Sequence, residues 1–298
     1  MGFSGQLCAL CEVRPSTAGD GEDAWPRWLL KRFRGTGPFT LYENDTPVMK
    51  RDGVTPRRSE GFPGVKLPAC DVCNPTLNRR FEEPAKPIIR RVFDVGAMLE
   101  LSAEDANVLA EWFVKTWLLL AHPAARHGEP RMIQKPLNLD LVIDDLYGWM
   151  IDGSPPPDTV SMWLMRQDVH DADNGELVTL QTPLPSISAD GRLIKFQSIW
   201  LGLDVLEATL VYHPHWPIEL PLEGEGRVAR LWPRDENEPL DLAALPPVHT
   251  REMSWLSGIR VVLPPDTFGV VSLPPLSPDT RLYELPEPIL GVMGESQK

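Results

Sequence analysis

Long apolar runs are scarce in this sequence of 298 residues. The most apolar stretch, WFVKTWLLLAH at residues 112–122, is too short for a bilayer-spanning helix and is interrupted by a lysine. The N-terminal stretch MGFSGQLCALCEV lacks the basic start and apolar run of a secretory leader. We therefore expect a soluble, cytoplasmic protein that makes no contact with membranes.

Several common catalytic motifs are also missing. The sequence contains no P-loop, no G-x-G-x-x-G fingerprint, no G-x-S-x-G elbow and no H-E-x-x-H. These absences exclude the commonest nucleotide-binding, hydride-transferring and hydrolytic sites.

Proline, by contrast, is abundant, with 32 residues. Because proline lacks an N–H and fixes φ, it favours loops and edge strands over long uninterrupted helices.

Basic residues are outnumbered overall but are concentrated near the N-terminus. The formal net charge is −13, yet residues 26–91 hold 14 basic and 7 acidic residues. Residues 101–298 hold 14 basic and 29 acidic residues. Local charge governs contact with phosphates, so the N-terminal part is the candidate for nucleic-acid contact. The acidic C-terminal part is a candidate surface for a protein partner, and a solvated surface with scattered ion pairs is the simpler alternative for both.

Only four cysteines occur, and all of them fall into C-x-x-C pairs. This spacing lets one tight turn present two sulfurs to a metal ion, and two such turns complete a tetrahedral zinc site. Disulfides would suit a secreted protein, and a thioredoxin-like site would need a single pair near a βαβ unit. The sequence therefore predicts a structural zinc site with four thiolates and no open position for water, formed by Cys8, Cys11, Cys70 and Cys73.

The region between the pairs predicts small elements of structure. AWPRWLLKRF, within residues 21–33, predicts a short helix with an apolar face and basic residues. The following stretch is punctuated by glycine and proline, which indicates short strands and loops. After the second pair, Pro75 fits the first turn of a helix, with Asn74 as its N-cap.

Three segments, CALC, EDAWPRWL and CDVCNPTLNRRFE, together resemble the zinc-containing HNH endonucleases. The resemblance covers roughly the first third of the chain and implies a ββα-metal fold with a treble-clef-like zinc knuckle. It places Glu22 at the acidic position of the motif and implies that Asn74 orients the base or braces the hairpin. Asn78 follows four residues later and would share a helix face with Asn74.

The resemblance breaks at the general base. Asp23 stands where the family has a histidine, and a carboxylate with an ordinary pKa of about 4 is a poor base near pH 7. No histidine occurs within residues 1–121. One interpretation is a module that binds without cutting, and another is a later histidine, His122 or His127, that enters the site.

A third interpretation keeps hydrolysis and replaces the histidine by a metal. Glu22 and Asp23 would then hold Mg²⁺ or Mn²⁺, and metal-bound water would serve as the nucleophile. A simpler role is also open for these two residues. They stand directly before AWPRWLLKRF, the predicted short helix, and the dipole of a helix favours acidic side chains at its N-terminus.

The rest of the chain predicts helices and then strands. LSAEDANVLAEWFVKTWLLLAH, residues 101–122, predicts a helix with Ser102 and Asp105 in a capping box. A second helix is expected within residues 137–153, and a proline run near residue 155 marks a boundary. From residue 158 onward, alternating segments predict an antiparallel sheet or small barrel.

Within this β-rich part, SADGRLIKF predicts a hairpin with an Asp-Gly turn. His213 and His215, in HPHWP, are interpreted as part of a loop at a strand end, because no third metal ligand accompanies them. The predicted fold class is α+β. Its parts are a zinc-bound, HNH-like module at 1–98, a helical segment at 99–155 and a β-rich acidic domain at 156–298.

These observations predict a zinc protein that contacts nucleic acid, DNA more than RNA, through phosphates. The residues expected to make these contacts are Arg27, Lys31, Arg32, Arg79 and Arg80. If the module is an endonuclease, its chemistry would lie near Glu22, Asp23, Asn74 and Asn78. The alternative is a non-catalytic binding or scaffold protein in which zinc serves only folding.

Overall fold

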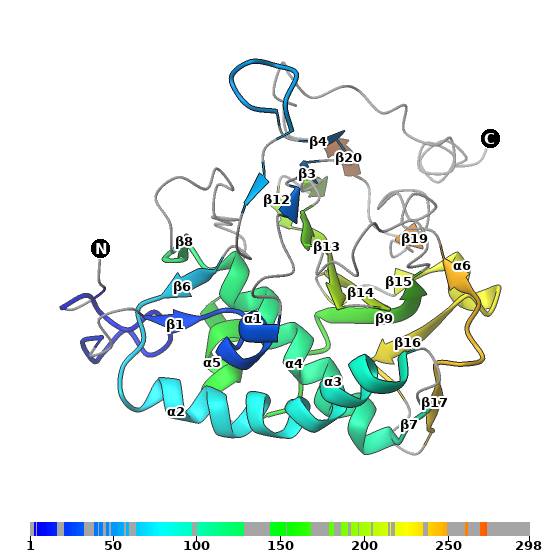
Figure 1. Ribbon diagram of the computed structural model, residues 1–298, viewed down its shortest axis with the longest axis horizontal. Helices are drawn as coiled ribbons and strands as arrows, with labels where there is room; N and C mark the ends of the chain where they lie inside the picture. Colours follow the sequence, from blue (N-terminus) through cyan, green and yellow to red (C-terminus); the bar gives the residue numbers. More distant parts are fainter. Residues whose placement is uncertain are drawn as a thin grey trace. The chain divides into compact units, whose positions relative to one another are not determined.

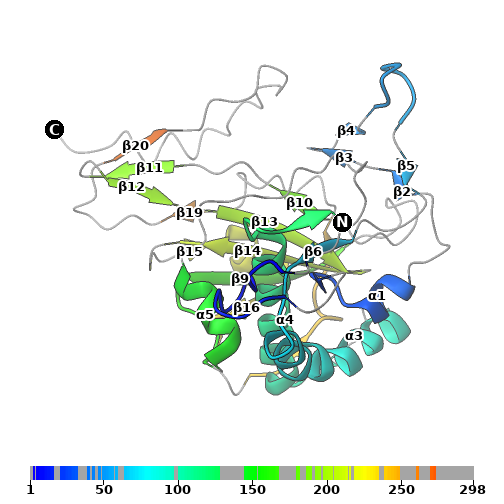
Figure 2. The ribbon, with the colours of Figure 1, turned by 90° about the vertical axis from the view of Figure 1, so that its left-hand side faces the viewer.

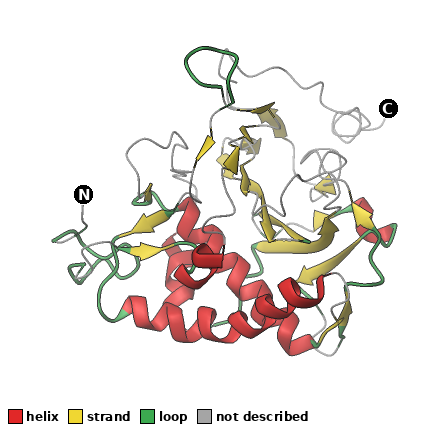
Figure 3. Ribbon diagram, viewed as in Figure 1, coloured by secondary structure: helices red, strands yellow, loops and turns green. Residues whose placement is uncertain are grey.

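The computed structural model contains both helices and antiparallel sheets, which confirms the predicted α+β class (Figure 3). The residues that it describes are 3, 5–16, 21–32, 39–40, 42–43, 46–47, 49–56, 58–59, 64–96, 100–127, 144–152, 154–167, 179–181, 186–189, 192–195, 197–203, 205–213, 215, 218–234, 238–248, 260–261 and 269–272. Within these residues, no helix has the length and apolar character needed to cross a bilayer.

The chain divides into two compact units. The first unit comprises residues 1–89 and 108–157, and the second comprises residues 90–107 and 158–298. The segment expected to form a helical middle, 99–155, is therefore shared between the units, with its larger part in the first. The long segment of the second unit begins close to the boundary expected at 156.

Three short strands form the central sheet of the first unit. They are β1 (Glu22–Asp23), β6 (Val65–Leu67) and β8 (Arg126–His127), which pair antiparallel in the order β1-β6-β8 (Figure 1). Asp23 lies opposite Lys66 on the neighbouring strand. β6 leads directly into the second cysteine pair, so the sheet and the cysteines are coupled through a few residues of backbone.

Two strand pairs lie between β1 and β6 in the sequence, where short strands were predicted. β2 (Phe39–Thr40) pairs with β5 (Arg58–Ser59), and β3 (Tyr42–Glu43) pairs with β4 (Thr46–Pro47). The short helix predicted within residues 21–33 is α1 (Arg27–Arg32).

The helical run after the second cysteine pair is continuous but changes register. α2 (Cys73–Leu77) passes into a π-helical turn, η1 (Asn78–Glu82), and then into α3 (Glu83–Val95). Pro87 lies inside α3, and Pro84 lies at its start. Because proline supplies no N–H, an unbroken ladder of i to i−4 hydrogen bonds cannot form through this run.

The prediction that Asn74 caps this helix is wrong. α2 begins at Cys73, its N-cap is Val72, and no side chain bonds to the first turn. Instead, the Cys73 N–H donates to the Cys70 sulfur at 3.4 Å, and the Asn74 N–H donates to the Cys70 carbonyl at 3.1 Å. The cysteine turn itself thus supplies acceptors for N–H groups at the start of the helix.

Aromatic side chains form much of the core of the first unit. The core includes residues of α4 (Ala103–Ala121) and of α5 (Asp144–Asp152). Trp112 of α4 is fully buried, and its ring centroid lies 5.9 Å from that of Trp25. Phe81 and Trp149 of α5 pack with centroids 5.2 Å apart. The two helices predicted within residues 101–122 and 137–153 are therefore present as α4 and α5. Residues 137–143 of the second prediction lie outside the described part.

The first turn of α4 has the cap that its sequence predicts. The Asp105 N–H donates to the Ser102 hydroxyl oxygen at 3.1 Å. The Asp105 carboxylate pairs with Arg91. Ser102 thus satisfies one of the N–H groups that a helix leaves without an intrahelical partner.

The second unit is built on an antiparallel sheet, as predicted (Figure 2). Its strand order is β10-β13-β14-β9-β16, and β18 runs parallel to β9 at one end. These strands are β10 (Thr179–Gln181), β13 (Gln197–Leu203), β14 (Leu206–Tyr212), β9 (Val160–Gln167), β16 (Val228–Trp232) and β18 (Pro247–Val248). β14 is buried at every position, so both of its faces are covered.

The remaining elements of the second unit are short. β11 (Ser186–Ala189) pairs with β12 (Arg192–Lys195), with Ala189 opposite Arg192, which confirms the predicted hairpin. Its two turn residues lie outside the described part. The other elements are β20 (Gly269–Ser272) beside β11, β15 (Ile218–Glu219) with β19 (Arg260–Val261), β17 (Leu240–Asp241) with β7 (Glu100–Leu101), and α6 (Pro221–Gly224).

Replacement of Trp112 by alanine tests the aromatic core. The change removes a fully buried ring that contacts Trp25 and Phe113. We expect the free energy of unfolding to fall by about 3–5 kcal/mol, as is typical of large-to-small core changes. Chemical denaturation of Trp112→Ala and of the exposed control Val54→Ala measures the difference. A loss below about 1 kcal/mol for Trp112→Ala would contradict this account of the core.

Candidate metal centre and adjoining hairpin

The four cysteines meet in the first unit. The sulfurs of Cys8, Cys11, Cys70 and Cys73 all lie within 4.8 Å of one another, and those of Cys11 and Cys70 are 3.9 Å apart. None of the four forms a disulfide. In a tetrahedral site with metal–sulfur bonds of about 2.3 Å, neighbouring sulfurs lie about 3.8 Å apart. The cluster therefore has the dimensions of a four-thiolate metal site and fits the predicted set of ligands.

Backbone hydrogen bonds hold the two cysteine turns together. In the first turn, the Glu12 N–H donates to the Cys8 carbonyl at 2.9 Å, and Glu12 has a φ of 52°. Between the turns, the Ala9 N–H donates to the Pro68 carbonyl at 2.8 Å, and the Ser16 hydroxyl donates to the Ala69 carbonyl at 3.0 Å. Cys11 and Cys70 are 59 positions apart in sequence, so these bonds bring distant segments into register.

The four thiols differ in acidity. Burial raises the pKa of Cys73 and, despite nearby N–H groups, that of Cys8. Burial also acts on Cys70, but backbone N–H groups of Cys73 and Val72 outweigh it and lower its pKa to about 7. Thiolate is the form that ligates a metal, so a cation at the centre would complete the deprotonation of the buried pair.

Asp23, which stands at the position of the family's histidine, is held between two cations. Its carboxylate is almost fully buried and lies 2.9 Å from the Arg27 Nε and 3.5 Å from the Lys66 Nζ. One carboxylate oxygen faces each cation. Both oxygens of the Asp23 carboxylate thus have a cationic partner within the chain, and Mg²⁺ or Mn²⁺ at Glu22 and Asp23 stays a prediction.

Glu22 has a different environment from its neighbour. Burial raises its pKa to about 7, with Lys115 acting against the rise and Glu82 and Asp23 adding to it. The nearby Lys115 is fully buried, forms an ion pair with Glu82 and donates to the Ala24 carbonyl at 3.4 Å. Because Lys115 is already paired with Glu82, it stabilises the ionised form of Glu22 less.

Glu82 and Lys115 were not predicted as part of this site. Glu82 lies in the π-helical turn and also accepts a hydrogen bond from the Trp112 indole at 3.4 Å. Lys115 was noted only as an interruption of an apolar stretch. A lysine on the buried side of a helix needs a partner, and this is the signal that could have pointed to a buried carboxylate.

The two predicted asparagines are placed differently. Asn74 is half-buried in the first turn of α2, directly after Cys73. Asn78 is exposed, and its amide donates to the Glu83 carboxylate at 2.7 Å. Asn78 is thus engaged within its own helical run, whereas Asn74 adjoins the cysteine cluster.

The five predicted phosphate contacts fall into two groups. Arg27, Lys31 and Arg32 of α1 and Arg79 of η1 are exposed. Arg80 instead donates to the Trp149 and Ser154 carbonyls and lies over the rings of Phe81 and Trp149, with its guanidinium carbon 4.7 and 5.0 Å from their centroids. Arg80 therefore fastens α5 to the π-helical turn.

The two histidines considered as substitutes for the base lie close to the sheet or the cysteines. His122 is buried, and its Nε2 lies 3.0 Å from the Ala9 carbonyl oxygen in the first cysteine turn. The backbone of His127 lies in β8, opposite Val65 of β6. His122 thus contacts the backbone of the first cysteine turn.

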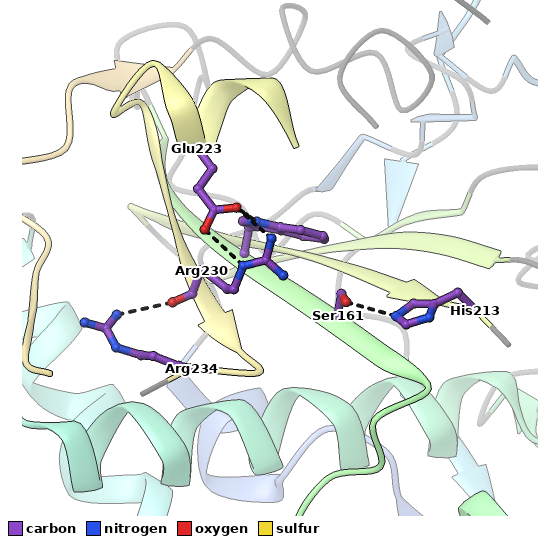
Figure 4. Close-up of polar contacts among 6 residues, drawn as sticks. Ser161, His213, Glu223, Arg230 and Arg234 are labelled. Carbon is purple, nitrogen blue, oxygen red and sulfur yellow. Dashed lines mark hydrogen bonds and ion pairs between the residues drawn. The ribbon is translucent and has the colours of Figure 1, made fainter. Parts of the chain in front are cut away.

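The second unit has a polar cluster that the sequence did not predict (Figure 4). Glu223 accepts hydrogen bonds from Arg230 at 3.0 and 2.8 Å and from the Trp163 indole at 2.8 Å. Although burial would raise the pKa of Glu223, these donors hold it below its ordinary value. Arg234 donates to the Arg230 carbonyl at 3.2 Å and so covers part of the outer edge of β16.

The predicted strand-end histidines lie near this cluster's sheet. His213 directly follows β14, and its Nε2 shares a hydrogen bond of 2.9 Å with the Ser161 hydroxyl (Figure 4). Burial lowers the pKa of His213 to about 4, so its imidazole is neutral near pH 7. His215 is exposed and lies 3.1 Å from Asp158.

A comparison of the chain with protein-family models, with curated proteins and with solved structures finds no match to any of them. Within the part of the chain that the structure describes, the four cysteines form the only group of three or more histidine, cysteine or acidic side chains close enough to share a metal ion.

The unusual environment of Glu22 predicts a pH-dependent stability. A pKa of about 7 in the folded chain lies above the ordinary value of 4.5, so the folded state holds this proton more tightly than the unfolded state. The resulting stability is fully present below pH 4.5 and is lost as pH rises through 7. Glu22→Gln should therefore gain about 2 kcal/mol on the native chain between pH 5 and pH 8.

Urea unfolding of both proteins at several pH values measures this gain. Glu225→Gln, at an exposed position of the second unit, is the control and should follow the native chain. Parallel pH profiles for Glu22→Gln and the native chain would show that burial does not raise the pKa of Glu22.

Proposed function

We propose that the first unit is a zinc-pinned module that binds nucleic acid, DNA more than RNA, through phosphate contacts. The observation that carries the proposal is the meeting of four cysteine sulfurs next to a strand–strand–helix element. Four thiolates are a ligand set typical of structural zinc. The bound ion would contribute folding free energy and would leave no coordination position for substrate.

The arrangement around the cysteines supports the resemblance to HNH proteins. β1 pairs antiparallel with β6, and β6 is followed by the second cysteine turn and the helical run from α2 to α3. This is the order that a ββα-metal module requires. Asn74, which directly follows Cys73, is the asparagine that the proposal assigns to bracing the hairpin.

Exposed basic side chains on α1 and η1 support the nucleic-acid contact. Lys31 and Arg32 lie in the last turn of α1, and Arg79 lies in η1. The ammonium of Lys86, in α3, lies 5.9 Å from the Trp28 ring centroid of α1, so α1 is a neighbour of α3, the helix that continues η1. Arg80 is left out of the proposed contacts because its guanidinium bonds to backbone carbonyls.

Metal content and nucleic-acid binding test the proposal on one purified sample. Elemental analysis should give one zinc per chain, and Cys70→Ser should reduce it, because one of four ligands is lost. The triple variant Lys31→Ala, Arg32→Ala, Arg79→Ala should bind duplex DNA more weakly. Its dependence of log K on log salt should be shallower by about 1 for each lost phosphate contact.

A control variant that removes two basic residues elsewhere in the unit separates lost phosphate contacts from lost positive charge. Lys50→Ala with Arg51→Ala removes exposed basic residues from a turn of the same unit and should leave the salt slope unchanged. Chains without zinc would contradict the metal centre and the family resemblance. Chains with zinc but without any DNA or RNA binding would favour the scaffold alternative, in which the knuckle serves only folding and partners are proteins.

We infer a second candidate function, phosphodiester hydrolysis with Glu22 as the general base. The observation that favours it is the pKa of Glu22, about 7, since a general base works best near the pH of the reaction. Asp23 is held by Arg27 and Lys66 and is assigned no proton transfer. Water would bond to phosphorus and give its proton to Glu22. The bond to the leaving oxygen would break, and that oxygen would take a proton from solvent.

Plasmid cleavage between pH 5.5 and 8.5, with Mg²⁺ or Mn²⁺ added, tests the second candidate. The rate should rise about tenfold per pH unit below pH 7 and then level off, as Glu22 loses its proton. Glu22→Gln should slow cutting by about 10²–10⁴, whereas the exposed control Glu104→Gln should cut normally. Cutting that is lost in Asp23→Asn but kept in Glu22→Gln would contradict the assignment. DNA binding without cutting would leave only the binding function.

A further inference from the structure

His122 connects the core of the first unit to the first cysteine turn. It directly follows α4 and is 7% exposed. Its Nε2 lies 3.0 Å from the carbonyl oxygen of Ala9, which stands between Cys8 and Cys11. His122 and Ala9 are 113 positions apart in sequence, so this contact exists only in the folded chain.

The second ring nitrogen determines how the first is protonated. The Ala124 backbone N–H donates to Nδ1 of His122 at 2.9 Å, so Nδ1 carries a lone pair. In a neutral imidazole the other nitrogen then bears the proton. Nε2–H therefore donates to the Ala9 carbonyl. The ring is also packed against Tyr147 of α5, with centroids 4.4 Å apart, which restricts its rotation.

Both ends of the Ala9 residue are thus fixed. Its N–H donates to the Pro68 carbonyl at 2.8 Å, on the segment that leads to Cys70, and its carbonyl accepts from His122. The first cysteine turn is joined to the second by a long stretch of chain, which by itself does little to hold the turn in place. Hydrogen bonds from elsewhere in the fold must therefore set where the sulfurs of Cys8 and Cys11 lie.

We propose that His122 is a positioning residue of the metal centre, which holds the Cys8–Cys11 turn in ligating geometry through the Ala9 carbonyl. The inference rests on the proposed function, in that the four cysteines bind zinc. His122 makes no contact with the ion. It lowers the cost of arranging two of the four sulfurs, and residues that orient ligands in this way typically change metal affinity by about 10–100-fold.

Zinc affinity and release measured on the full chain test this role. A chromogenic chelator competes for the metal, and the rate of transfer and the equilibrium constant are both recorded. His122→Ala should bind zinc about 10–100-fold more weakly and release it faster, because the Ala9 carbonyl loses its donor. Leu118→Ala, at a fully buried position of the same helix, is the control for a general loss of stability.

Two amides separate positioning from packing. The Gln side chain places an N–H donor near the position of Nε2, whereas the shorter Asn places its polar atoms near Nδ1. His122→Gln should therefore keep near-native zinc affinity, and His122→Asn should resemble His122→Ala. Because Asn is also smaller than Gln, the free energy of unfolding of both variants is measured, and the difference in zinc affinity must exceed the difference in stability. The comparison remains decisive if the alanine variant fails to fold.

The outcomes distinguish the two proposals. A native chain that binds no zinc overturns the proposed function together with this inference. A native chain that binds zinc, with His122→Gln and His122→Asn equal to each other in affinity and release rate, overturns the role of His122 alone. A loss in Leu118→Ala as large as that in His122→Asn, at the same stability, would overturn it as well.

Discussion

Four sulfur atoms that approach within 4.8 Å of one another impose the main constraint on the first unit. Ligating sulfurs are thiolates, and four negative charges at this distance are tolerated only around a cation. The pairs come from segments 59 positions apart, so closing the cluster fixes the start of α2 and the end of β6. The strand pairing of β1 with β6 and the orientation of the helical run then depend on the same few residues.

The ionisable side chains near β1 form two separate sets of ion pairs, one around Asp23 and one around Glu82. Arg27 and Lys66 neutralise Asp23, and Lys115 neutralises Glu82 inside the core. Burial raises the pKa of Glu22, and the nearby Lys115 opposes this rise only in part. Breaking either ion pair would leave a charge buried without a partner, which is more costly than the pair is stabilising. These pairs therefore bear on the local fold whether or not the unit carries out chemistry.

In the second unit, several polar side chains on the sheet form hydrogen bonds with one another. The Glu223 carboxylate accepts hydrogen bonds from Arg230 and from the Trp163 indole. Ser161 and His213 share a hydrogen bond. Arg234 bonds to the carbonyls of Arg230, Glu238 and Pro239 beside β16. The Arg230 carbonyl of β16 is thereby occupied, which makes this part of the strand less able to pair with another chain. The acidic composition of this part of the sequence therefore includes carboxylates that bond within the unit.

The sequence by itself determined the features that depend on short spacings. Two residues between cysteines identified the four candidate metal ligands, and apolar periodicity identified α4 and indicated the antiparallel sheet of the second unit. Ser102 was recognisable as a helix cap because its partner lies three residues away. An Asp-Gly pair between alternating segments was enough to predict the hairpin of β11 and β12. Local geometry is encoded locally, so no knowledge of distant contacts was required.

Only the tertiary structure decided the environment of the site. It paired Asp23 with Lys66 and Glu82 with Lys115, placed His122 against Ala9, and turned Arg80 toward the backbone of α5. It also replaced the expected Asn74 cap with the acceptors of Cys70. Each of these depends on which segments the packed core brings together. The energy of an ion pair or hydrogen bond depends on burial and on its partner, and neither is contained in the spacing of residues along the chain.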